Sequence, residues 1–177
     1  MIWESQYWKE PLLKSALWLR KVRVKEASGE KLFVKLEKKL LVGFYSVRKL
    51  MDTVKISDST KAKNYQVMWF TNARPVDFLN WHHIDRLFDL EKTNQETRSI
   101  RFICDRFIHS YVLIPAFEGE RFNGVYIASD SDKRKKLYFI SADIIVSIFR
   151  LVGRDYPSHA KLIRNPETGE MEAYEIS

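Results

Sequence analysis

The sequence contains a single cysteine, Cys104, among its 177 residues. One thiol cannot form an internal disulfide or supply a cysteine-based zinc site, so both kinds of stabilisation are excluded. Glycine and proline are scarce, with 6 and 5 residues, and this predicts long elements with few breaks. No hydrophobic run approaches the roughly 18 residues of a membrane-spanning helix, and the first residues lack the pattern of a signal peptide. We therefore expect a soluble, cytoplasmic protein with no membrane role.

The short motifs of several large enzyme classes are also missing. The sequence has no glycine-rich phosphate loop, no GxSxG, no HExxH and no CxxC. The common nucleotide hydrolases, serine hydrolases and zinc enzymes are therefore disfavoured. His82 and His83 are adjacent, and adjacent residues on a helix point in different directions, so we predict no metal site. We also predict no cofactor.

Aromatic residues and positive charge, by contrast, are abundant. The 5 Trp, 8 Tyr and 11 Phe exclude a disordered chain, and the length suits a single domain spanning residues 1–177. Residues 1–55 hold 13 Lys/Arg and 6 Asp/Glu, a difference that equals the whole net charge of +7. This concentration is compatible with a polyanion partner such as RNA or DNA. A basic helix surface in contact with water explains it equally well.

The hydrophobic pattern predicts an α+β protein that is predominantly helical: a four-helix bundle with small antiparallel β-hairpins. Two amphipathic helices, from Pro11 to about Glu26 and from about Glu30 to Val54, are expected to form an antiparallel hairpin. A strand is plausible at 65–70. The bundle is expected to comprise residues 10–56, 81–114 and 141–153, and the hairpins about 123–141 and 159–176.

The stretch from Thr93 to Ala116 carries the strongest helix signal. Thr93 and Glu96 have the spacing of a capping box, and Pro115 limits the far end. On a helical wheel the apolar residues, Cys104 included, fall on one face, which predicts a buried cysteine. The opposite face gathers four polar residues, Arg98, Arg101, Asp105 and His109.

Residues 103–110, Ile-Cys-Asp-Arg-Phe-Ile-His-Ser, and the predicted order of four helices resemble the HEPN superfamily. The members of this superfamily are four-helix bundles, and many are metal-independent ribonucleases that act as dimers. Asp105 and His109 fit the last two positions of the family motif. Its arginine position is occupied by Ile103, which departs from the pattern, and Arg101 and Arg106 are the candidates to replace it. The resemblance implies an RNA-directed domain of defence or toxin type and a homodimer.

A catalytic mechanism follows from the resemblance. His109 would act as the general acid or base, Asp105 would orient it or hold the arginine, and Arg101 would contact the non-bridging phosphate oxygens. Further contacts to RNA are expected from five side chains: Arg98, Arg106, Phe102, Lys35 and Lys39.

The same residues fit a second hypothesis, a non-catalytic module that dimerises or binds a protein partner. In that case Arg101 and Asp105 form a surface ion pair, and His109 stabilises the helix C-terminus. The sequence leaves open whether the protein is an enzyme.

Overall fold

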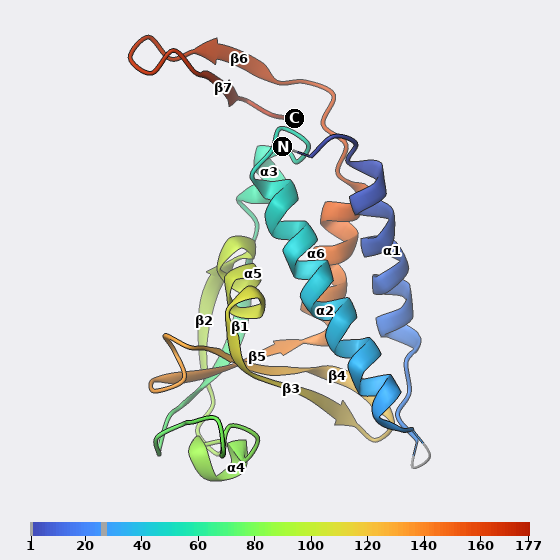
Figure 1. The fold of residues 1–177 in the computed structure, drawn as a ribbon, viewed down its shortest axis with the longest axis vertical. Helices are drawn as coiled ribbons and strands as arrows, with labels where there is room; N and C mark the ends of the chain where they lie inside the picture. Colours follow the sequence, from blue (N-terminus) through green and yellow to red (C-terminus); the bar gives the residue numbers. More distant parts are fainter. Residues whose placement is uncertain (1, 26–27) are drawn as a thin grey trace.

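The computed structural model describes residues 2–25 and 28–177. A five-stranded antiparallel sheet, in the order β2-β1-β5-β4-β3, lies at its centre (Figure 1). Its strands are β1 (Asn64–Thr71), β2 (Asn94–Ser99), β3 (Ser110–Glu118), β4 (Arg121–Ser129) and β5 (Lys136–Ser141). The helices are α1 (Gln6–Lys21), α2 (Glu30–Met51), α3 (Asp58–Lys61), α4 (Ile84–Leu87), α5 (Ile100–Ile108) and α6 (Ala142–Arg154). A separate two-stranded sheet consists of β6 (Lys161–Arg164) and β7 (Met171–Tyr174).

Helices α5 and α6 cover one face of the sheet, and α2 packs against both of them (Figure 1). Phe44 of α2 stacks on Phe107 of α5 with ring centroids 3.8 Å apart, and its centroid lies 5.0 Å from that of Phe149 in α6. Gly43 permits this approach, because a Cβ atom there would lie 2.3 Å from the ring of Phe149. With α1 packed along α6, these helices and the sheet enclose the main hydrophobic core.

The other face of the sheet is covered by the long connection between β1 and β2. Val76, Leu87 and Phe88 of this connection are buried against Phe70 and Leu137 of the sheet. This second core is smaller than the main core, and it explains why the strands carry apolar residues on both faces.

The expected predominantly helical four-helix bundle is wrong, because a five-stranded antiparallel sheet forms the centre of the molecule. The error lies mainly in residues 81–114, which were expected to be helical. This segment contains strand β2, the nine-residue helix α5 and the first half of β3.

The predicted helix from Thr93 fails because both of its ends belong to strands. Residues 94–99 pair with β1, so Glu96 lies in the sheet and caps nothing. The helix begins later, where the Ser99 hydroxyl accepts a hydrogen bond of 3.2 Å from the Phe102 backbone N–H. Pro115 lies opposite Val125 within β3, an edge strand, where a residue without an N–H is tolerated.

Other local predictions agree with the structure. Helix α2, strand β1, helix α6 and the two expected hairpins are present, and the Ser141 hydroxyl caps α6 by accepting from the Ile144 N–H at 3.3 Å. Helix α1 begins at Gln6, earlier than expected, and ends at Lys21 with Pro11 inside it. Glu26, its predicted end, lies outside the described residues. Among the described helices, none has the length and apolar character needed to cross a membrane.

Candidate nucleic-acid interface

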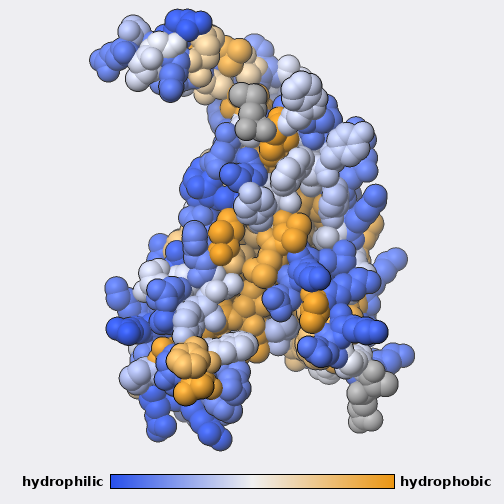
Figure 2. Space-filling view, viewed as in Figure 1, coloured by the Kyte–Doolittle hydropathy of each residue, from blue (hydrophilic) through white to orange (hydrophobic). Residues whose placement is uncertain are grey.

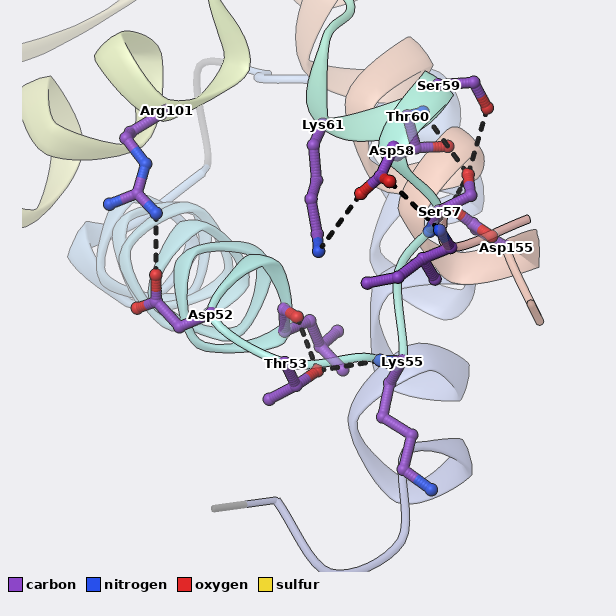
Figure 3. A network of polar contacts seen from close by, with 12 residues as sticks. Asp52, Thr53, Lys55, Ser57, Asp58, Ser59, Thr60, Lys61, Arg101 and Asp155 are labelled. Carbon is purple, nitrogen blue, oxygen red and sulfur yellow. Dashed lines mark hydrogen bonds and ion pairs between the residues drawn. The ribbon is translucent and has the colours of Figure 1, made fainter. Parts of the chain in front are cut away.

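The polar face of α5 is bonded to the end of α2. The Arg101 Nη2 atom lies 2.7 Å from Asp52 Oδ1, an ion pair visible in Figure 3. Arg48 bridges the remaining members, since its guanidinium contacts Asp52 Oδ2 and lies 3.2 Å, through Nε, from Asp105 Oδ1. The four side chains form one alternating chain of charges, Arg101–Asp52–Arg48–Asp105, that ties α5 to α2.

The pKa shifts in this chain follow from the same contacts. Burial alone would raise the pKa of Asp52, but the hydrogen bonds from Arg48 and Arg101 outweigh it and lower that pKa. The hydrogen bond to Asp52 is the main cause of the raised pKa of Arg48. Asp52 and Arg48 are therefore charged at neutral pH, and the ion pairs match the charges of the chain within the protein.

His109 lies outside this chain of charges. It is an exposed residue at the C-cap of α5, and its backbone N–H donates to the Asp105 carbonyl at 3.0 Å. Within residues 2–25 and 28–177, its imidazole makes no hydrogen bond, while Asp105 is bonded to Arg48 and Arg101 to Asp52. The three predicted catalytic residues share one face of α5, but their side chains are not bonded to one another.

Arg101 also lines the largest cavity of this region, of about 1020 Å³. The cavity lies between the end of α2, the first residues and β7, and Lys55 and Lys61 contribute to its wall. Lys61 is paired with Asp58 at 3.7 Å, as Figure 3 shows. Arg101 therefore faces a space bounded mainly by apolar side chains, in which Asp52 and Lys61 are already paired and the Lys55 ammonium forms no ion pair with the described residues.

Phe102, Arg98 and Arg106 do come together, as three of the residues predicted to contact RNA. The guanidinium carbons of Arg98 and Arg106 lie 4.4 and 4.5 Å from the centre of the Phe102 ring. Each arginine also has a carboxylate partner, Glu96 for Arg98 at 2.7 Å and Asp132 for Arg106. The cluster is therefore neutralised internally, which favours a structural role over binding of an external anion.

Glu96 is the centre of this cluster. Its carboxylate contacts Arg98 and, at 2.8 Å, the Lys136 ammonium, which lies over the Trp69 ring. Burial alone would raise the pKa of Glu96, but hydrogen bonds from Arg98, Lys136 and Tyr138 together lower it to about 2. The same environment raises the pKa of Tyr138 to about 12, first through burial and then through Glu96.

This depressed pKa predicts a specific dependence of stability on pH. The folded pKa of Glu96 is below its ordinary value of 4.5, so its stabilisation is present above pH 4.5 and is lost as the pH falls toward 2. We expect Glu96→Gln to lower the unfolding free energy by about 1–2 kcal/mol near neutral pH, after allowance for solvent screening, and by much less near pH 2. Urea denaturation across this range measures the difference. Substitution of an exposed glutamate, Glu118→Gln, should cause no pH-dependent change in the unfolding free energy. An equal effect of Glu96→Gln at all pH values would contradict the lowered pKa of Glu96.

Lys35 and Lys39, the other two residues predicted to contact RNA, lie on α2 next to Trp18 of α1. Their ammonium groups lie 5.2 and 5.4 Å from the Trp18 ring, and Lys39 is 3.5 Å from the Ser15 hydroxyl. Trp18 packs against the main core, so its ring has a structural role, and the two lysines border a groove between α1 and α2.

A further positive surface, without ion pairs in the described chain, involves none of the predicted residues. Arg20 of α1 and Arg150 and Arg154 of α6 line a groove of about 720 Å³, together with Ser57 and Ser147. A smaller groove of about 150 Å³ shares Arg20 and adds two further arginines, Arg23 and Arg121. We call these five residues the arginine surface: Arg20, Arg23, Arg121, Arg150 and Arg154.

The arginine surface is formed by contacts between distant parts of the chain. Helices α1 and α6 pack side by side, and a bridge between Arg23 and Arg121 brings the chain after α1 next to the start of β4. Within the described part of the chain, none of the five guanidinium groups forms an ion pair. Asp143 is present in both grooves, and Asp155 accepts hydrogen bonds from Ser57. Positive charge therefore predominates here.

No family model, curated protein or solved structure matches this chain. Among the described residues, no group of three or more His, Cys, Asp or Glu side chains is arranged to hold a metal ion. Cys104 is buried in the main core as expected, and burial raises the pKa of its thiol.

Part of the arginine surface has a signal in the sequence. Arg150 and Arg154 are four residues apart in α6, so they project from one side of that helix, whereas Arg23 lies beyond the end of α1 and its position next to Arg20 has no such signal. The missing information is the pairing of α1 with α6. The residues after position 55 include 17 basic and 17 acidic side chains and so have no net charge. Composition therefore does not indicate the surface, although Arg121, Arg150 and Arg154 belong to this part of the chain.

Proposed function

We propose that the protein is an RNA-binding protein whose arginine surface contacts the phosphate backbone. The observation that carries the proposal is a group of five arginines in two adjoining grooves, none of which has a carboxylate partner among the described residues. A guanidinium group binds phosphate oxygens through two parallel hydrogen bonds, and its charge does not titrate at physiological pH. Several such groups along one surface are what a polyanion with repeated phosphates requires.

The choice of RNA over other polyanions rests on the resemblance of α5 to the HEPN motif. That resemblance now depends on Asp105 and His109 alone, because the four-helix bundle that accompanied it is absent. Binding fits the geometry better than cleavage, since Asp105 is paired with Arg48 and the His109 imidazole has no bonded partner in the described chain. The proposal is therefore an RNA binder whose α5 motif is degenerate.

Removal of two arginines from the surface tests the proposal. We expect Arg150→Ala/Arg154→Ala to weaken binding of a fluorescent single-stranded RNA by about tenfold or more at moderate salt. The slope of log affinity against log salt should also fall by about 1.4, since each lost contact to a single strand removes about 0.7. Fluorescence anisotropy over a salt series measures both quantities.

The matched control removes two arginines from another exposed part of the molecule. Arg74 and Arg86 lie on the connection that covers the second core, and Arg74→Ala/Arg86→Ala should leave the affinity and the slope nearly unchanged. Equal losses in both double variants, or no RNA binding by the unaltered protein, would refute the proposal. Single-stranded DNA of the same sequence distinguishes RNA preference from general polyanion binding.

The same samples decide the question of cleavage. Incubation with RNA in the presence of EDTA should leave the RNA intact if the α5 motif is degenerate. Cleavage that disappears with His109→Ala but persists with the adjacent control Ser110→Ala would instead establish a metal-independent ribonuclease.

A further inference from the structure

Strands β6 and β7 form a hairpin that extends away from the rest of the molecule (Figure 1). We call residues 161–175 the β arm. Its base is fixed by Ile176, which is buried, and whose backbone N–H donates to Asp58 Oδ2 at 3.0 Å. Beyond this base the arm consists of two strands that pair only with each other, with a turn at Asn165–Glu170.

The β arm exposes apolar side chains on both of its faces. Leu162 and Met171 are 58% and 52% exposed, and Ile163 and Tyr174, on the opposite face, are 46% and 44% exposed. Figure 2 shows hydrophobic atoms along the arm, between its hydrophilic tip and the rest of the molecule. A two-stranded hairpin by itself is only marginally stable in water, so such a surface favours association with a partner.

A surface of matching character exists elsewhere on the same chain. The groove between α1 and α2, of about 800 Å³, has apolar walls that include Leu12, Val34 and Val42. Four lysines border it: Lys31, Lys35, Lys38 and Lys39. None of the four forms an ion pair within residues 2–25 and 28–177, and Glu30 is the one acidic residue of the described lining. We call this site the lysine groove.

The charges of the two surfaces are complementary. The β arm contains four glutamates and two basic residues, Lys161 and Arg164. Lys161 is already paired with Glu175 at 3.7 Å, while Glu167 and Glu170 at the tip have no ion-pair partner in the described chain. The arm thus offers apolar side chains with an acidic tip, and the lysine groove offers an apolar floor with a basic border.

From this match we infer that the β arm of one copy docks in the lysine groove of a second copy. In Figure 1 the arm of the same chain points away from α1 and α2, the helices that line the groove, so a second molecule must supply the occupant. Reciprocal exchange of two arms gives a closed two-fold dimer in which each copy donates one arm and accepts another. The inference does not depend on the proposed function, because the arginine surface contributes no residue to the β arm or to the lining of the lysine groove.

Reversal of charge tests the inference in the full chain without RNA. We expect the unaltered protein to be a dimer at high micromolar concentration, as measured by light scattering and sedimentation equilibrium. Glu167→Lys/Glu170→Lys and Lys31→Glu/Lys38→Glu should each raise the dimer dissociation constant by about tenfold or more. The chain that carries all four reversals should regain most of the affinity, because the signs match again.

Reversal of two exposed glutamates elsewhere, Glu91→Lys/Glu118→Lys, is the matched control and should leave the dimer unchanged. A protein that remains monomeric at these concentrations overturns the inference. A dimer whose dissociation constant is unaffected by the arm and groove variants also overturns it. So does a chain with all four reversals that dimerises more weakly than either double variant.

Cross-linking between differently labelled copies locates the contact. Cys104 is buried and does not interfere. One chain with Ile163→Cys, mixed with another carrying Val42→Cys, should give a heterodimer with a short bis-maleimide. A partner chain with Leu17→Cys, exposed on α1 but outside the groove, should give little product. Equal yields from the two mixtures would place the arm elsewhere and reject the inference.

Discussion

Phe44→Ala is expected to lower the free energy of unfolding by about 3–5 kcal/mol. Phe44 is fully buried at the point where α2 meets both α5 and α6, stacked on Phe107 and in contact with Phe149. Truncation removes the apolar area and leaves a cavity that these two rings cannot fill, because the helices are held in place by the sheet beneath them. Chemical denaturation monitored by circular dichroism measures the change.

The control is a phenylalanine that carries no such contacts. Phe78 is 76% exposed, so Phe78→Ala should change the unfolding free energy by no more than about 0.5 kcal/mol. A loss of less than about 1 kcal/mol for Phe44→Ala would show that α2 does not hold the helical layer together.

Asp132→Ala is expected to cost about 2–4 kcal/mol, because it leaves the Arg106 guanidinium without its carboxylate partner. The Arg106 side chain is only 15% exposed, and burial lowers its pKa. The Nε atom of Arg106 already lacks a hydrogen-bond partner in the described part of the chain. Loss of Asp132 therefore leaves a largely buried cation whose main remaining contact is the Phe102 ring.

A second substitution distinguishes this cause from simple loss of a turn residue. Arg106→Met removes the charge and keeps the volume, so Asp132→Ala/Arg106→Met should be clearly more stable than Asp132→Ala alone. Asp130→Ala, which removes an exposed partner of Lys133, should cost little. A double variant no more stable than the single one would attribute the loss to the hydrogen bond between Ser129 and Asp132 instead.

The elements that sequence reasoning predicts correctly depend on local signals. The apolar stripe of α2 and the two hairpins are encoded within short segments, and each forms as expected. Residues 94–99 and 110–118 differ, because their strand conformation depends on pairing with β1 and β4. A helical wheel over residues 93–116 places side chains on one face that in the folded protein belong to three elements, β2, α5 and β3.

The candidate site follows the same rule. Sequence reasoning placed Arg101, Asp105 and His109 on one helical face, and they do share the polar side of α5 or its cap. The sequence does not indicate that Arg48 and Asp52, which lie at the end of another helix, form ion pairs with Asp105 and Arg101. The arginine surface was missed for the same reason, because its residues meet only when α1 packs along α6.

Pro115 has a consequence for how copies of the protein meet. The open edge of β3 would offer a row of N–H and C=O groups to a strand from another chain, which is a common route to aggregation. A proline within this strand removes one donor, and the register shifts of β3 at Ser110/Val112 and Ala116/Phe117 bend the edge out of a regular ladder. At the other edge, β2 carries charged side chains at Glu96 and Arg98. Growth of the sheet into open-ended polymers is therefore discouraged at both sides.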